Sequence, residues 1–180
     1  SDSPEYEQYV KDVMTFVVPS SVTTIGEMSF NYANMKNVYF PEGLKTIETL
    51  AFFEIPLLEN LYSYKATSPV TDSHYVSDEA LGTVYNSLPE GLEYIGSDAF
   101  SYNREMKYMF IPSSVTYIGH NAFWDTVYKD GKELKGITKM NVALSEEEFE
   151  NAVETGNDWC PKYDFLLFKK SIEIEYGATR

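Results

Sequence analysis

Two histidines are the first side chains to consider for chemistry in this chain of 180 residues. His74 lies in the stretch TDSHYVSDE, close to Asp72, Asp78 and Glu79. Carboxylates can orient an imidazole or share a metal ion with it, so this stretch could hold a metal or acid–base site. Carboxylates in polar loops are normally just solvated, however. We therefore predict a polar loop and keep a hydrolase or metal site around His74 as the less favoured alternative.

The remaining candidates for chemistry have simpler interpretations. Cys160 is the single cysteine and has no histidine or basic cluster beside it, which favours a buried structural thiol over a nucleophile. The acidic run EEEFE at 146–150 opens an expected helix, where the helix dipole favours carboxylates, and it lacks EF-hand spacing. His120 occupies a variable position, where an exposed side chain is expected. No phosphate-binding glycine loop, GxSxG or HExxH motif occurs. We predict no catalytic centre, no metal site and no cofactor.

The charge of the chain restricts its partners. The chain carries 28 acidic against 14 basic residues, a net charge of −14. Such a surface repels phosphate backbones and anionic lipids, which argues against nucleic-acid binding. No apolar run is long enough to span a bilayer, and no basic-then-apolar leader is present. We therefore expect a soluble mature region without membrane insertion.

A repeated motif places most of the apolar residues. It starts at a proline at position 19, 41, 89 or 112, and the same residue types recur three, six, ten and eleven positions later. The recurring residues are Val22, Leu44, Leu92 and Val115; Ile25, Ile47, Ile95 and Ile118; Ser29, Ala51, Ala99 and Ala122; and Phe30, Phe52, Phe100 and Phe123. A fixed period of this length indicates a repeat architecture.

Between the second and third motifs the spacing is 48 residues, about two of the periods of 22 and 23 seen elsewhere. An apolar-x-x-apolar-x-apolar segment precedes each motif proline, and parts of it recur in LENLYS and LGTVYN. We therefore predict a degenerate repeat at residues 64–88.

Each repeat is expected to form a short strand, a turn and a return segment. The alternating apolar residues predict a strand with one buried face. Proline ends that strand, and the following Ser-Ser or Glu-Gly makes a turn. The isoleucine and phenylalanine of the return segment then fill an interior that stacked repeats share.

The segments outside the repeats predict caps, because a stack of repeats leaves an apolar cross-section bare at each end. At the N-terminus, a short helix capped by Ser3 would place four apolar side chains on one face. These are Tyr6, Tyr9, Val10 and Val13. At the C-terminus, Ser145 and Glu148 predict a capping box, and Gly156 predicts the helix end. The alternating stretch SIEIEY predicts a final strand.

The motif resembles the BspA-type leucine-rich repeats of bacterial surface proteins, whose consensus runs I-P-x-x-V-x-x-I-G-x-x-A-F and then L-x-x-V-x-I-P. The resemblance covers Val13 to Ile137. It implies an α+β repeat solenoid, a right-handed coil of five to six repeats with short parallel strands. The expected division is one leucine-rich repeat domain over 1–180, with an N-terminal helical cap (1–14), repeats (15–138) and a C-terminal helix-plus-strand cap (139–180).

An outward-facing aromatic row is the main candidate for binding. The middle residue of each apolar-x-apolar segment points away from the core. In the central repeats this position holds Tyr39, Tyr62, Tyr85 and Phe110, with Tyr108 beside Phe110. Cross-strand aromatic pairs can simply stabilise a sheet. A contiguous exposed row can instead be a recognition surface. Both interpretations stay open.

The functional hypothesis is a non-enzymatic module that binds a protein or glycan through this row. The resemblance implies a bacterial secreted or cell-surface protein used in adhesion, although a fold does not fix a function. The alternatives are a structural spacer of a larger surface protein and the hydrolase or metal site around His74. We expect a monomer.

Overall fold

The structure is a computed structural model that describes residues 3–74, 76–124, 136–153 and 172–180. Some sequence features lie outside the described residues. These are the predicted helix stop at Gly156 and the single cysteine, Cys160.

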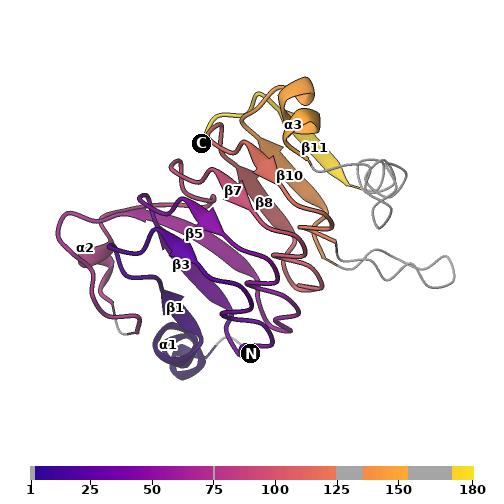
Figure 1. The fold of residues 1–180 in the computed structure, drawn as a ribbon. Coiled ribbons are helices and arrows are strands. Elements are labelled where there is room, and N and C mark those ends of the chain that lie inside the picture. The colour runs from indigo at the N-terminus through magenta and orange to yellow at the C-terminus, as the bar shows by residue number, and fades with distance from the viewer. Residues whose placement is uncertain (1–2, 75, 125–135, 154–171) are drawn as a thin grey trace, which may run out of the picture.

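Three sheets carry the repeats (Figure 1). The first sheet contains β1 (Thr15–Val17), β3 (Asn37–Pro41), β5 (Asn60–Lys65) and β6 (Thr83–Tyr85), in that order. The second sheet contains β2 (Thr24–Ile25), β4 (Thr46–Ile47), β7 (Tyr94–Ile95) and β9 (Tyr117–Ile118). The third sheet contains β8 (Tyr108–Ile111), β10 (Lys139–Val142) and β11 (Glu173–Tyr176), in the order β11-β10-β8.

The chain passes repeatedly between sheets, and nearly all pairs within a sheet are parallel. β1 pairs with β3, and β3 with β5, while β2 pairs with β4 in the second sheet. Three helices lie outside the sheets within the described part of the chain: α1 (Pro4–Val13), α2 (Asp78–Leu81) and α3 (Glu146–Ala152). Short parallel strands and few helices are what the sequence motif predicted.

The repeated apolar residues fill the space between the sheets, as expected. The motif phenylalanines form a stack, with ring centroids 5.1 Å apart for Phe30–Phe52, 5.4 Å for Phe52–Phe100 and 6.1 Å for Phe100–Phe123. Phe30 alone is half-buried, because the first repeat has a repeat on only one side. One cluster of buried side chains runs from Val18 to Phe149 and includes the motif isoleucines.

Backbone hydrogen bonds along the return segments join one repeat to the next. The amides of Met28, Phe30 and Tyr32 donate to carbonyls of the following repeat at 3.1, 2.9 and 3.0 Å. Met28 and Tyr32 have positive φ angles of 56° and 58°, and Leu50 has one of 58°. A bulky residue rarely adopts this region, so the packed stack must hold it there. These positive φ angles were not predicted from the sequence.

Glycine after the motif isoleucine allows two repeats to approach closely. A Cβ atom on Gly96 would lie 2.4 Å from the backbone nitrogen of Thr49, and one on Gly119 would lie 2.4 Å from that of Ser97. These positions therefore require glycine for a packing reason.

The predicted degenerate repeat at 64–88 is wrong. β4 pairs directly with β7, with Thr46 opposite Tyr94 and Ile47 opposite Ile95, so the second and third motifs are neighbours in the stack. After β5 the chain instead leaves the stack as an excursion, residues 66–82, and returns as β6, which runs antiparallel to β5. Gly82, with φ of 66°, makes the return next to the Lys65 backbone, where a Cβ would lie 2.5 Å from the Lys65 carbonyl oxygen.

The excursion covers the free edge and part of the outer face of the first sheet. The Val17 amide donates to the Ser73 carbonyl at 2.9 Å, and the Ser20 amide to the Val70 carbonyl at 2.9 Å. A second small core forms on this outer face from Val17, Tyr64, Val70 and Leu81. The excursion thus satisfies an edge strand that would otherwise be open to pairing with other chains.

The N-terminal helix forms as predicted but covers less than expected. Ser3 caps it by accepting from the Tyr6 amide at 3.2 Å. Tyr6, Tyr9 and Val13 nevertheless remain 39%, 48% and 46% exposed. The helix therefore leaves much of its apolar face in solvent.

The C-terminal helix and strand are confirmed. The capping box of Ser145 and Glu148 is present, and the helix ends at Ala152, before the predicted stop. Phe149 is buried within the main core. Val153 forms an isolated parallel bridge with Ile118 of the second sheet, and β11 pairs in parallel with β10.

Two glycine-to-alanine substitutions test whether stability depends on the close approach of the repeats. Gly96→Ala places a methyl group against the Thr49 backbone, so the free energy of unfolding should fall by roughly 1–3 kcal/mol. In the control, Gly43→Ala, the added Cβ meets nothing within 4 Å, and stability should stay within about 0.5 kcal/mol of the parent. Urea denaturation measures both, and equal effects would contradict the close approach of the repeats.

Candidate functional site

Two members of the predicted aromatic row lie together as expected. Val17, Tyr39 and Tyr62 occupy matched positions on β1, β3 and β5. The rings of Tyr39 and Tyr62 stack with centroids 4.8 Å apart and an interplanar angle of 30°. Both side chains are half-buried on the outer face of the first sheet. This pair forms the aromatic part of the candidate site.

The rest of the row is broken, so the expectation of one continuous exposed row is wrong. Tyr85 lies opposite Ser63 because β6 is antiparallel, and the Arg180 guanidinium covers its ring at 3.4 Å. Phe110 is only 3% exposed. Tyr108 and Phe110 belong to the third sheet, opposite Lys139 and Asn141. The reversal at β6 interrupts the parallel stacking that would have aligned these rings with Tyr62.

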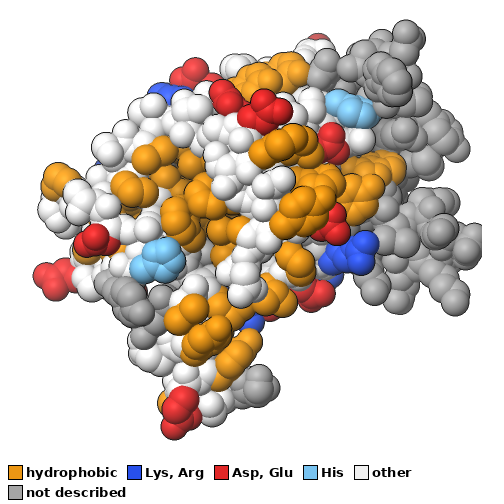
Figure 2. Space-filling view, turned by 60° about the horizontal axis from the view of Figure 1, so that its bottom comes forward, with side chains coloured by type: hydrophobic (Ala, Val, Ile, Leu, Met, Phe, Trp, Pro, Cys, Tyr) orange, Lys and Arg blue, Asp and Glu red, His pale blue; other side chains and the backbone are white. Residues whose placement is uncertain are grey.

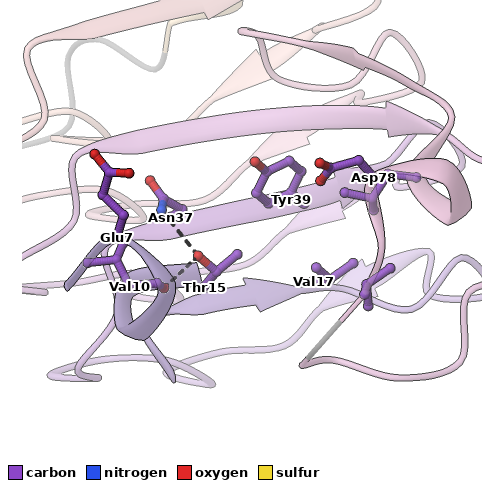
Figure 3. Close-up of a pocket in the computed structure, with 9 residues that line it drawn as sticks. Glu7, Val10, Thr15, Val17, Asn37, Tyr39 and Asp78 are labelled. Carbon is purple, nitrogen blue, oxygen red and sulfur yellow. Dashed lines mark hydrogen bonds between the residues drawn. The ribbon is translucent and has the colours of Figure 1, made fainter. Parts of the chain in front are cut away.

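A groove lies beside the Tyr39–Tyr62 pair, between α1 and the excursion (Figure 3). We call it the Tyr39 groove; its volume is about 260 Å³. Its floor comes from β1 and β3, and its two walls from α1 and from the excursion. The lining residues are Glu7 and Val10 from α1, Thr15, Val17, Asn37 and Tyr39 from the strands, and Val76, Asp78 and Leu81 from the excursion. Figure 3 shows Glu7 at one end and Asp78 at the other, with Tyr39 between them.

A line of polar side chains fixes one end of the groove. Thr15 Oγ1 donates to the Val10 carbonyl at 3.0 Å and accepts from Asn37 Nδ2 at 3.2 Å. Asn60 Nδ2 donates to Asn37 Oδ1 at 2.9 Å. These bonds tie α1 to the sheet and hold the amides in one orientation. A site that is ordered before binding loses less side-chain entropy when a ligand arrives.

The groove has acidic surroundings and neutral phenols. Burial raises the pKa of Tyr39, and the neighbouring Tyr62 and the Asp78 carboxylate raise it further. Burial and the Glu59 carboxylate likewise raise the pKa of Tyr62. Both rings therefore stay protonated at neutral pH. No Lys or Arg is among the described lining residues, so the groove favours positive charge.

His74 lies in the excursion, beside Phe16 of the first sheet. Its side chain is exposed, its ring lies 5.8 Å from the Phe16 ring in an edge-on arrangement, and its Nδ1 is 3.1 Å from Ser73 Oγ. Within the described residues, no three His, Cys, Asp or Glu side chains are grouped as metal ligands would be. His120 is half-buried where the sequence indicated an exposed side chain. The geometry thus gives no support to a metal or hydrolase site around His74.

A second aromatic pair was missed in the sequence. Tyr94 and Tyr117 stack on the second sheet, with centroids 4.6 Å apart and an interplanar angle of 6°. They stand five residues after the motif proline, where the first two repeats have Thr24 and Thr46, so the spacing could have revealed them. A shallow hollow beside Tyr94 is lined by Glu27 and Glu48.

Apolar and acidic side chains are interspersed on the surface. Figure 2 shows hydrophobic side chains in bands across one face, with carboxylates between them and few basic groups. Tyr32, Phe53 and Tyr102 add a line of edge-on rings, 5.9 and 5.3 Å apart. Among all these features, only the Tyr39 groove combines aromatic rings, ordered amides and carboxylates between two walls.

Comparison with known families matches most of the chain. The model of a BspA type leucine rich repeat region matches residues 5–129, in six copies. No curated protein matches the chain. Among the helices that the structure describes, none has the length and apolar character to cross a membrane.

Tyr64 should make stability depend on alkaline pH. Its buried hydroxyl donates to the Val18 carbonyl at 2.6 Å, and burial raises its pKa to about 12 from 10.0. Between these two values the unfolded chain releases this proton while the folded chain keeps it, so stability is lost as pH rises. Tyr64→Phe should reduce that loss by up to about 1.4 kcal/mol per pH unit in urea denaturation between pH 10 and 12. An unchanged pH slope in the variant would contradict the buried, neutral phenol.

Proposed function

Because the chain belongs to the BspA-type leucine-rich repeat family, we propose that it is a non-enzymatic interaction module that binds a protein or glycan through the Tyr39 groove. This groove replaces the longer binding surface predicted from the sequence, which comprised Tyr39, Tyr62, Tyr85, Tyr108 and Phe110. Tyr39 and Tyr62 are the retained part of that row.

One observation carries the proposal: the excursion builds a walled groove beside an aromatic stack on the outer face of the first sheet. Packing of the repeats alone does not need this wall, because β4 and β7 pair without it. Tyrosine supplies large contact area at low cost in side-chain entropy, which favours it in binding surfaces. The ordered amides of Asn37 and Asn60 add hydrogen-bonding groups beside the rings.

Membership of the family supports a proposal for where the module acts. We place it in a bacterial secreted or cell-surface protein with a role in adhesion, acting as a repeat domain capped by α1, the excursion and the α3–β11 segment. A monomer fits the acidic outer edge of β11, where Glu173 and Glu175 are exposed and discourage pairing with another strand. A spacer of a larger surface protein is the rival function, and it requires no ligand for the groove.

The test is an array of glycans and matrix proteins probed with the whole chain. A partner found there should bind Tyr39→Ala and Tyr62→Ala more weakly by about 1–2 kcal/mol or more, the usual effect of losing a central aromatic anchor. Tyr94→Ala, which removes an exposed ring from the second sheet, is the matched control and should bind like the parent.

Thermal melting first establishes that all three variants are folded. Full binding by both groove variants, or equal loss in the Tyr94→Ala control, would contradict the groove as the binding site. A chain that binds nothing on the array favours the spacer.

A further inference from the structure

We infer that the Tyr39 groove receives a cationic side chain, preferentially the guanidinium of an arginine, from an extended segment of a protein partner. This inference rests on the proposed function and specifies its ligand. The guanidinium group is carried by the arginine side chains of proteins, so the inference favours a protein over a glycan as the binding partner.

Charge at the groove is the first support. The carboxylates of Glu7 and Asp78 stand at its two ends, and no described lining residue is a Lys or Arg. The whole chain has a net charge of −14, which attracts a basic partner over a longer range. A cation in the groove would therefore meet complementary charge at both ends.

The aromatic floor is the second support. The face of a tyrosine ring attracts a cation, and a planar guanidinium can also stack on it. Tyr39 is half-buried and remains a neutral phenol, so it offers the groove a ring rather than a competing charge. Tyr62 lies outside the lining and stacks on Tyr39, with ring centroids 4.8 Å apart. Val17, Val76 and Leu81 can contact the apolar stem of a long basic side chain.

The chain itself shows the same chemistry in two other places. Arg180 lies 3.4 Å over the Tyr85 ring and pairs with the carboxylates of Glu42 and Glu90. Lys36 lies 5.9 Å from the Tyr6 ring and 3.0 Å from Glu59. In both places an aromatic ring and a carboxylate hold one cation that the chain supplies. The described lining of the Tyr39 groove has the same two kinds of group, an aromatic ring and carboxylates.

The size of the groove sets the size of the ligand. At about 260 Å³ it is smaller than the roughly 300–1,000 Å³ typical of sites that enclose a whole small molecule. It suits one long side chain, with the rest of the partner outside. Side chains of an extended segment point alternately to opposite sides, so such a segment can present a single basic side chain to the groove.

A pair of short peptides tests the inference. The probes are acetyl-Gly-Gly-Arg-Gly-Gly-amide and the same peptide with citrulline, which keeps the shape of arginine and removes its charge. Titration into the whole chain at low salt is followed by the NMR signals of the tyrosine rings. The arginine peptide should shift the Tyr39 and Tyr62 signals and bind about tenfold more tightly than the citrulline peptide, and salt should weaken it.

Charge variants locate the effect. Glu7→Gln and Asp78→Asn should each weaken the arginine peptide several-fold and leave the citrulline peptide unchanged. Glu105→Gln removes an equal charge from an exposed residue outside the groove and is the matched control. Asp78 opens α2, so melting curves must show that Asp78→Asn is folded. If Asp78→Asn does not fold, Glu7→Gln alone tests the inference.

The outcomes separate this inference from the proposed function. Equal binding of both peptides, shifts confined to Tyr94 and Tyr117, or no shift at all would overturn the cationic ligand. If an array partner still depends on Tyr62 in that case, the groove binds something else and the proposed function stands. If the arginine peptide binds as expected while no array partner depends on the groove, the cationic ligand stands and the proposed function is contradicted.

Discussion

Close contact between the backbones of successive repeats is the constraint on which the rest of the structure depends. The alternate amides of the return segments bond from one repeat to the next, and Gly96 and Gly119 let the chains approach to distances that exclude a Cβ atom. At this spacing the rings of Phe52 and Phe100 stack with centroids 5.4 Å apart. Residues such as Leu50 accept an unfavourable φ because the stack supplies the compensating bonds.

The same constraint explains where the extra residues between two motifs go. β4 and β7 must be neighbours for the stack to continue, so the residues after β5 have no place inside it. They fold over the outer face, where Tyr64, Val70 and Leu81 make a small core with Val17. The groove is a consequence of that detour, because one of its walls is the detour itself. A binding surface thus arises without any change to the repeat.

Prediction from the sequence succeeded where the periodic pattern determines the structure. The motif offsets identified the interior phenylalanines and isoleucines, and the capping box identified α3. It failed for 64–88, because LGTVYN has the apolar spacing of a repeat strand while its direction depends on the turn at Gly82. The aromatic row failed for the same reason, since the outward alignment of Tyr85 and Phe110 assumed uninterrupted parallel strands. Glu7 and Asp78 line the same groove only through the fold, and the sequence predicted neither as part of a binding groove.

The bonds from Val70 and Ser73 back to the first repeat also change how the chain can come apart. In a simple repeat array each unit touches only its neighbours, and the terminal units fray first. Here Ser20 and Val70 are 50 positions apart in sequence, and the side chain of Ser20 bonds to Val70 as well. The first repeat cannot open without releasing a segment that leaves the stack after β5. The first repeat and the excursion should therefore unfold together, so that the N-terminal end belongs to the same cooperative unit as the middle of the chain.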